Sequence, residues 1–122
     1  MKINGQCHCG AVQFTAEVKG GLASARRCDC SLCTMRGAVA VSAALDGLEI
    51  TQGAENLTLY QFNTRVAEHY FCKTCGIYTH HQRRKNPNQY GFNLACIEGI
   101  DIREFGDVST TDGSTMSVVR HK

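Results

Sequence analysis

The sequence predicts an all-β protein, and three observations lead to this prediction. The chain of 122 residues contains several short runs in which apolar and polar residues alternate, as they do in strands with one buried face. Turn signals rich in glycine, asparagine and aspartate separate these runs. No window of about twelve residues or more carries the 3.6-residue apolar period of a helix. The length fits one domain with a modest core.

The expected strands follow one another along the chain. The first covers residues 12–18, where every second residue is apolar, and Gly20-Gly21 marks the turn after it. A short helical turn is expected around residues 30–36. The further candidate strands cover residues 38–44, 57–62, 67–71, 77–81 and 90–97.

Composition and charge exclude several classes of protein. Apolar residues make up 43% of the chain and charged residues 20%, which is typical of a globular protein and not of a disordered one. No apolar run approaches the roughly 20 residues that span a bilayer, and the N-terminus has no apolar signal region. We therefore expect a cytoplasmic protein without a membrane partner. A net charge of +2 does not favour nucleic acid as a partner, and nothing specifies an oligomeric state.

Cysteine is the residue type that stands out. The eight cysteines are Cys7, Cys9, Cys28, Cys30, Cys33, Cys72, Cys75 and Cys96. Disulfides rarely persist in a reducing cytoplasm, and cysteines so close in sequence form strained ones. All but Cys96 fall into three tight clusters, whose thiolates can share a metal, and zinc is the default metal for such sets. The sequence therefore predicts zinc binding.

Seven thiolates divide naturally into four and three. Four close a structural zinc site, whereas three leave a position open for water or substrate. Cys7 and Cys9 can join either the Cys72/Cys75 pair or two members of the cluster at residues 28–33. The first partition is simpler, because two pairs then make one site and the local triplet makes the other. One structural site with further cysteines in the core is the remaining alternative.

The ordered motifs resemble those of a known family. They are Gly5-Gln6-Cys7-His8-Cys9-Gly10-Ala11-Val12, Arg27-Cys28-Asp29-Cys30-Ser31-Leu32-Cys33 and Phe71-Cys72-Lys73-Thr74-Cys75-Gly76, followed by the strand-like residues 90–96. In order and spacing they are similar to the glutathione-dependent formaldehyde-activating enzyme family, whose eukaryotic relatives include centromere protein V. The resemblance covers about residues 3–105, the expected core of a single domain at residues 1–122.

The resemblance implies a fold, two zinc ions and an activity. The fold would be a β-tent of folded sheets, related to zinc ribbons. A structural zinc would be held by Cys7, Cys9, Cys72 and Cys75, and a catalytic zinc by Cys28, Cys30 and Cys33. The activity would be that of a carbon–sulfur lyase that joins glutathione, as cosubstrate, to an aldehyde such as formaldehyde. The alternative function is a zinc-ribbon-like module that binds a protein or nucleic acid without catalysis.

Basic residues near the clusters have two possible roles. Arg26, Arg27 and Arg36 lie beside the triplet and could anchor the carboxylates of glutathione through charge-assisted hydrogen bonds. We favour the other interpretation, a solvated basic rim. Arg83-Arg84-Lys85 is expected to form an exposed loop.

Two histidines follow the third cluster and could supply a general acid or base. Alternation along a strand sends His80 and His81 to opposite faces, so at most one is expected to face the site. His8, between two candidate ligands, is expected to point outward. Cys96 lies in an apolar run and is expected to be a core thiol, and Asp29 is assigned no catalytic role.

Overall fold

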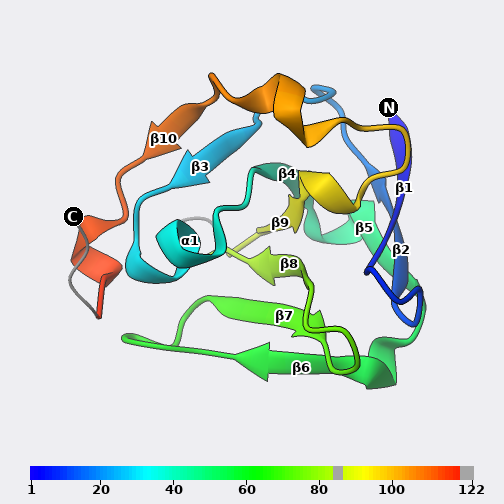
Figure 1. Ribbon diagram of the computed structural model, residues 1–122, viewed down its shortest axis with the longest axis horizontal. Helices are drawn as coiled ribbons and strands as arrows, with labels where there is room; N and C mark the ends of the chain where they lie inside the picture. Colours follow the sequence, from blue (N-terminus) through cyan, green and yellow to red (C-terminus); the bar gives the residue numbers. More distant parts are fainter. Residues whose placement is uncertain (84–86, 119–122) are drawn as a thin grey trace.

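Two β-sheets make up most of the protein, in agreement with the all-β prediction. The computed structural model describes residues 1–83 and 87–118, and the four residues at the C-terminal end of the predicted domain lie outside them. One sheet has three strands, and the other has seven (Figure 1). Within the described residues there is one short α-helix, and no helix is long and apolar enough to cross a bilayer.

The smaller sheet has the spatial order β1-β2-β5 and is antiparallel. Its strands are β1 (Lys2–Gln6), β2 (Gln13–Glu17) and β5 (Leu48–Gln52). In β1 and β2 buried residues alternate with more exposed ones, so each strand presents one face to the core. The close crossing of β1 by the Phe14 ring requires a glycine at Gly5, where a Cβ would lie 2.5 Å from Phe14 Cζ.

The larger sheet has the order β10-β3-β4-β9-β8-β7-β6, in which β10 and β3 are parallel and the other pairs antiparallel. Its strands are β3 (Arg26–Cys28), β4 (Ala40–Ala44), β6 (Leu57–Tyr60), β7 (Glu68–Cys72), β8 (Tyr78–Gln82), β9 (Gln89–Asn93) and β10 (Ser109–Thr111). It curves around the helix α1 (Ser31–Arg36), with β3 and β10 on one side and β6 and β7 on the other (Figure 1). The loop that carries α1 therefore lies on the concave side of the sheet.

Short 3₁₀ turns complete the structure. They are Leu45–Gly47, Ala54–Asn56, Leu94–Cys96, Ile102–Phe105 and Ser114–Met116. The turn at Leu94–Cys96 explains why β9 is shorter than the predicted strand at residues 90–97. There the Asn93 side chain accepts a hydrogen bond from the backbone N–H of Ala95, at 3.1 Å, which caps the turn and ends the strand.

The core fills the space between the two sheets. Phe14 from the smaller sheet contacts Phe92 from the larger one, with ring centroids 6.3 Å apart. Val39, Val41 and Leu94 are fully buried around this pair. Cys96 is half-buried and packs against this cluster, as expected of a core thiol. The cysteine clusters lie outside this core, at the turns and on the concave side.

Candidate functional site

Two turns from different sheets bring four cysteine sulfurs together. Cys7 and Cys9 lie between β1 and β2, whereas Cys72 ends β7 and Cys75 lies in the turn that leads to β8. All four Sγ atoms lie within 4.8 Å of one another, and the Cys9 sulfur is 3.7 Å from that of Cys7 and 3.6 Å from that of Cys72. A tetrahedral zinc with Zn–S distances near 2.3 Å needs sulfurs about 3.8 Å apart. The arrangement therefore fits the predicted four-thiolate site.

The four-cysteine group is held by hydrogen bonds to its sulfurs. The backbone N–H of Val12 donates to Cys7 Sγ at 3.3 Å, and the Asn56 amide donates to Cys72 Sγ at 3.4 Å. Such donors stabilise a thiolate. Cys7 and Cys72 are fully buried, whereas His8 is exposed and points away from the core as expected. The group links the two sheets and closes the end of the core.

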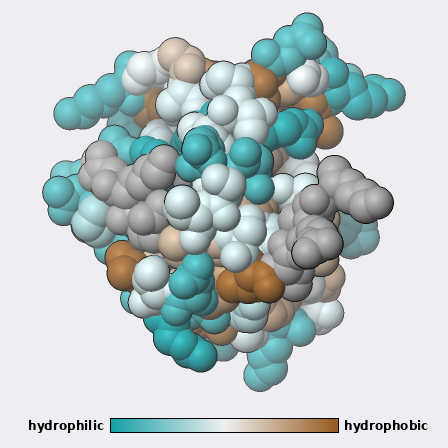
Figure 2. All heavy atoms as spheres, turned by 90° about the vertical axis from the view of Figure 1, so that its left-hand side faces the viewer, coloured by the Kyte–Doolittle hydropathy of each residue, from teal (hydrophilic) through white to brown (hydrophobic). Residues whose placement is uncertain are grey.

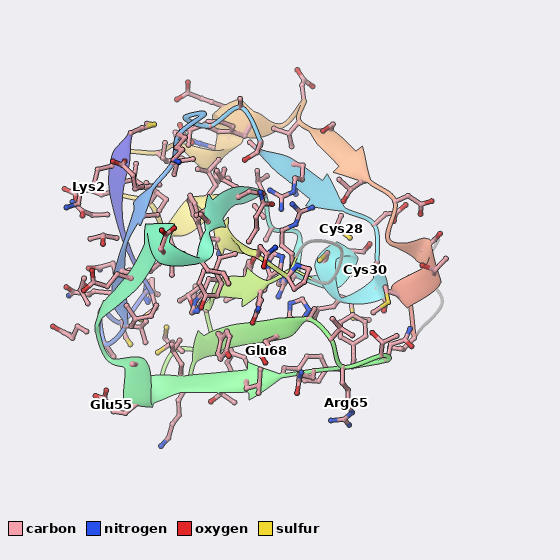
Figure 3. The ribbon with its side chains drawn as sticks, turned by 180° about the vertical axis from the view of Figure 1, so that it is seen from behind. Lys2, Cys28, Cys30, Glu55, Arg65 and Glu68 are labelled. Carbon is pink, nitrogen blue, oxygen red and sulfur yellow. The ribbon has the colours of Figure 1, made fainter. Side chains whose placement is uncertain are left out.

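The other three clustered cysteines form a local group on the concave side of the larger sheet. Cys28 ends β3, Cys30 caps α1 and Cys33 lies in its first turn, which confirms the predicted helical turn. Their sulfurs also lie within 4.8 Å of one another. Figure 3 shows Cys28 and Cys30 beside α1, away from Lys2 and Glu55 at the other end of the molecule.

Each sulfur of the three-cysteine group accepts a hydrogen bond. The N–H of Cys30 donates to Cys28 Sγ at 3.5 Å, and that of Cys33 donates to Cys30 Sγ at 3.3 Å. Arg36 Nη2 donates to Cys33 Sγ at 3.4 Å. Three convergent sulfurs with donors fit a zinc ion that keeps one position open. The structure thus brings the seven cysteines together in the two predicted groups, and their role as metal ligands stays a prediction.

The charges of the three thiols are strongly unequal. Hydrogen bonds from the Cys30 and Cys33 thiols hold the pKa of Cys28 well below its ordinary value. Donation to Cys28 and Cys30 raises the pKa of Cys33 far above its ordinary value. These shifts favour the thiolate form at Cys28 and the protonated thiol at Cys33.

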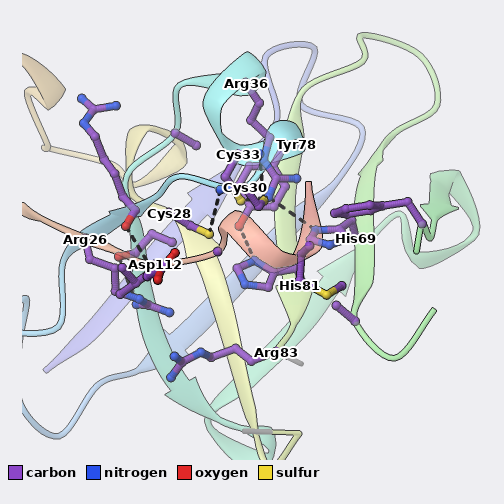
Figure 4. A pocket seen from close by; sticks show the side chains of 18 residues that line it. Arg26, Cys28, Cys30, Cys33, Arg36, His69, Tyr78, His81, Arg83 and Asp112 are labelled. Carbon is purple, nitrogen blue, oxygen red and sulfur yellow. Dashed lines mark hydrogen bonds between the residues drawn. The ribbon is translucent and has the colours of Figure 1, made fainter. Parts of the chain in front are cut away.

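A pocket opens beside the three-cysteine group (Figure 4). Its volume is about 110 Å³. Six strands or helices and the loops beside them form its wall: β3, α1, β4, β7, β8 and β10. The polar and thiol side chains of the wall belong to Arg26, Arg27, Cys28, Cys30, Cys33, Arg36, His69, Tyr78, His81, Arg83, Thr111 and Asp112.

Four arginines line this pocket, which corrects the expectation of a solvated basic rim. Arg26, Arg27 and Arg36 are joined there by Arg83, so Arg83 does not lie in an exposed loop. The remainder of that predicted loop lies outside the described residues. Within residues 1–83 and 87–118 none of the four forms a salt bridge. Burial and the nearby Arg83 lower the pKa of Arg26. The wall also holds one carboxylate, that of Asp112, but the four guanidinium groups outnumber it, and this excess of positive charge favours an anionic ligand.

Arg36 connects the sulfurs to the aromatic wall. Besides Cys33, its Nη2 contacts His69 Nδ1 at 3.4 Å, and its guanidinium lies 3.6 Å from the ring centroid of Tyr78. Its Nε is buried and has no hydrogen-bond partner among the residues that the structure describes. The cation–π contact and the sulfur contact fix this guanidinium beside the open side of the three-cysteine group.

One of the two predicted histidines faces the pocket, in agreement with the alternation argument. His81 lines it and pairs through Nδ1 with the Tyr78 hydroxyl at 2.6 Å. His80 lies on the other face, stacked on Tyr70 and edge-on to Tyr90. Burial lowers the pKa of His80 to about 4, and the pKa of His81 well below its usual range. Both rings are therefore neutral at pH 7.

Several wall residues were not identified from the sequence. His69 was missed, although β7 and β8 pair it directly with His81 and the two rings stack 5.2 Å apart. Burial and then Arg36 lower its pKa to about 4. The strand register would have revealed it. Thr111, Gly113 and Met116 gave no local signal, because β10 is short and polar.

Comparisons with known proteins agree with this geometry. The model of the family described as glutathione-dependent formaldehyde-activating enzyme matches residues 2–107. A curated Halomonas elongata protein that carries the family's name is 37% identical over 84 residues, which cover 62% of this chain and 52% of that protein, so the chain spans about half of its length. A crystal structure of a Rhodobacter sphaeroides protein, a structural genomics target, is 59% identical with a TM-score of 0.86 and covers 88% of this chain and 99% of its own. The chain belongs to the glutathione-dependent formaldehyde-activating enzyme family.

Proposed function

We propose that the protein is a zinc-dependent carbon–sulfur lyase that acts on the adduct of a thiol and an aldehyde, with glutathione and formaldehyde as the first candidates. The observation that carries this proposal is the three-cysteine group, whose sulfurs converge at the wall of an arginine-lined pocket. The family name supports glutathione and formaldehyde as reactants.

The two cysteine groups would have different roles. The four sulfurs of Cys7, Cys9, Cys72 and Cys75 would hold a structural zinc. Cys28, Cys30 and Cys33 would hold the catalytic zinc, which supplies an open position where a thiol loses its proton near neutral pH. All further steps are assigned to side chains of the chain itself.

The arginines would bind the anionic part of the thiol. The hydrogen bonds of Arg26, Arg27 and Arg83 to other described residues all use Nη1, so each guanidinium keeps further N–H groups for a ligand. Glutathione carries two carboxylates, and arginine binds carboxylates by charge-assisted hydrogen bonds. A cavity of about 110 Å³ is smaller than the roughly 300–1,000 Å³ of a site that encloses a drug-sized ligand. The pocket would therefore enclose only the reacting end of the adduct.

His81 and Tyr78 would handle the proton of the reaction. Burial raises the pKa of Tyr78, so its hydroxyl stays protonated and donates to His81 Nδ1, which leaves the proton of the neutral ring on Nε2. When sulfur attacks the aldehyde carbon, the C–S bond forms and the C=O electrons move to oxygen. This oxygen would take the proton of His81 Nε2 while the Tyr78 hydroxyl passes its proton to Nδ1. The proton that the thiol released to solvent on binding would then restore the Tyr78 hydroxyl, and the reverse reaction would use the same groups.

The alternative binding module has less support. The net charge of +2 is low. On the face that includes the C-terminal part of the described chain, hydrophobic side chains form separate patches among hydrophilic ones (Figure 2). Neither a strongly basic surface nor a broad apolar one is therefore evident there.

Metal analysis combined with a glutathione titration tests the proposal. We expect two zinc ions per chain, of which one exchanges readily and responds to glutathione, and a Cys30→Ser variant that keeps only the other. Catalysis is then measured by NMR exchange between free and adduct formaldehyde, because the two reactants also combine spontaneously. One tightly held zinc without thiol binding would contradict the proposal and favour the binding module.

A further inference from the structure

The end of the described chain forms part of the pocket, although the family match stops before it. The match ends at residue 107. Residues 109–118, named here the C-terminal segment, contribute Thr111, Asp112, Gly113 and Met116 to the pocket wall. We infer that this segment is a positioning element of the three-cysteine group: it holds Cys28 and Cys30 in place for the metal and closes one side of the pocket.

A parallel strand pair first attaches the segment to the cysteine loop. β10 runs beside β3, with Ser109 opposite Arg26 and Thr111 opposite Cys28. The N–H of Asp29 donates to the Thr111 carbonyl at 3.2 Å, and the Thr111 hydroxyl donates to the Arg27 carbonyl at 3.3 Å. The backbone on both sides of Cys28 is thus fixed by residues more than 80 positions later in the chain.

Gly113 makes the closest approach to the sulfurs. Its N–H donates to the Asp29 carboxylate at 2.5 Å, so the residue between two candidate ligands anchors the segment. A Cβ at Gly113 would lie 2.6 Å from Cys28 Sγ and 2.9 Å from Cys30 Cβ. The backbone at Gly113 has φ −117°, which other residues adopt easily. Glycine is therefore needed here for space beside the sulfur and not for its conformational freedom.

The segment then continues across the pocket. Met116 is buried and lines the cavity, and the N–H of Val118 donates to the Ser31 hydroxyl at the start of α1, at 3.0 Å. From the other side, the Asn63 amide, in the loop between β6 and β7, donates to the Thr115 carbonyl at 3.4 Å. The segment therefore joins the cysteine loop to the opposite side of the curved sheet.

The test compares two glycines of the same region. Gly113→Ala places a methyl group against Cys28 Sγ, whereas Gly106→Ala adds a methyl group with no atom within 4 Å, at an ordinary φ of −66°. This inference rests on the proposed function, under which the wild-type chain binds two zinc ions. We expect Gly113→Ala to weaken the second zinc at least tenfold while the first is retained, and Gly106→Ala to match the wild type. A purely structural role would lower the melting temperature without this selective loss of one metal.

Alkylation of the chain that keeps only its tightly held zinc, after removal of the readily exchanging one, gives a second readout. With iodoacetamide and mass spectrometry, we expect Cys28 to react several-fold faster in Gly113→Ala than in Gly106→Ala, because the displaced segment uncovers its sulfur. Wild-type zinc content and alkylation rate in Gly113→Ala would overturn the inference. A wild-type chain with one zinc would instead count against the proposed function, and the alkylation rates would still decide the inference. If Gly113→Ala does not fold, Asp29→Ala removes the same anchor from the other partner, with the same expected results.

Discussion

The two cysteine groups are built from the same side chain but differ in how the chain assembles them. The four-cysteine group joins two turns that are about 60 residues apart in sequence, and its donors are backbone and amide N–H groups. The three-cysteine group lies within six consecutive residues. Arg36 donates to one of its sulfurs, and arginines, histidines and a tyrosine surround it.

Because of this difference, we expect loss of the four-cysteine group to affect the fold and loss of the three-cysteine group to affect the chemistry. Loss of the four-cysteine group would remove one link between the two sheets, which are also held together by the core between them. Loss of the three-cysteine group would leave the sheets in place, because β3 and α1 are linked to the rest by few strand pairings. Under the proposed function, the zinc with an open position lies on the local group, and the closed structural zinc lies on the long-range group.

The largest expected effect is on the fold. Cys72→Ser removes a buried member of the four-cysteine group. Because a structural zinc site contributes on the order of 10 kcal/mol to folding, we expect this variant to be unfolded at room temperature by circular dichroism. Cys96→Ser is the matched control, since this half-buried cysteine belongs to neither group, and it should stay folded with both metals.

The second effect is complete loss of one metal with little change in the fold. Cys30→Ser should keep one zinc per chain, lose thiol binding and activity, and melt within a few degrees of the wild type. Metal content and thermal denaturation are measured on the same sample. Equal stability of Cys30→Ser and Cys72→Ser would contradict the assignment of a structural zinc to the four-cysteine group and a catalytic zinc to the three-cysteine group.

The third effect is a loss of folding stability at low pH, which we expect from His80, a residue that belongs to neither cysteine group. Burial lowers the pKa of His80 from 6.5 to about 4. The ring stacks on Tyr70, whose pKa is raised and which stays neutral, and it hydrogen-bonds to the uncharged Thr79. Between pH 6.5 and pH 4 the His80 ring is protonated in the unfolded chain and neutral in the folded chain. The contribution of this ring to the free energy of unfolding is therefore fully present above pH 6.5 and is lost as the pH falls toward 4. The loss amounts to about 3 kcal/mol.

Denaturant unfolding of the wild type and His80→Phe from pH 7 to pH 5 measures this effect. The phenylalanine variant should lose less stability over that range, and zinc content is checked at each pH. Parallel curves would show that the acid sensitivity comes from other groups, such as the cysteine groups or the buried His69 and His81, and not from the His80 ring.

The smallest effect concerns the ligand alone. Arg26→Gln removes one pocket charge, so we expect glutathione to bind about tenfold more weakly, or about 1.4 kcal/mol, with two zinc ions still present. Binding of the uncharged 2-mercaptoethanol should not change. Arg103→Gln is the control, because Arg103 is exposed and paired with Asp101 outside the pocket. Equal weakening for both thiols would contradict an anion-binding role of Arg26.

Local patterns predicted the strands with clear alternation but not the short ones. The strands that correspond to β2, β4, β6, β7, β8 and β9 were expected from the sequence, whereas β1, β3, β5 and β10 were not. Apart from the buried Ile3, β1 contains only polar residues and glycine, so its alternation is not visible. The three-residue strands β3 and β10 exist because of a parallel pairing across more than 80 residues, which local sequence does not encode.

For the site, too, the residues that are close in sequence were predicted, and those that come together only in the folded structure were not. The three cysteine clusters were visible because each is local in sequence. Spacing left two partitions open, and the division into four and three was implied by the resemblance to the family. Tyr78 and His69 could not be assigned to the pocket, since their positions depend on the register between β7 and β8. The role of Gly113 depends on the tertiary contact with Cys28 and has no signature in the sequence.

The late position of the C-terminal segment has a consequence for how the protein is made. Synthesis proceeds from the N-terminus, and all four residues of the structural group have been made before residue 76. The partners that fix the Cys28 loop arrive only after residue 108. Under the proposed function, the four-cysteine group can therefore take up its zinc before the partners of the three-cysteine group have been made.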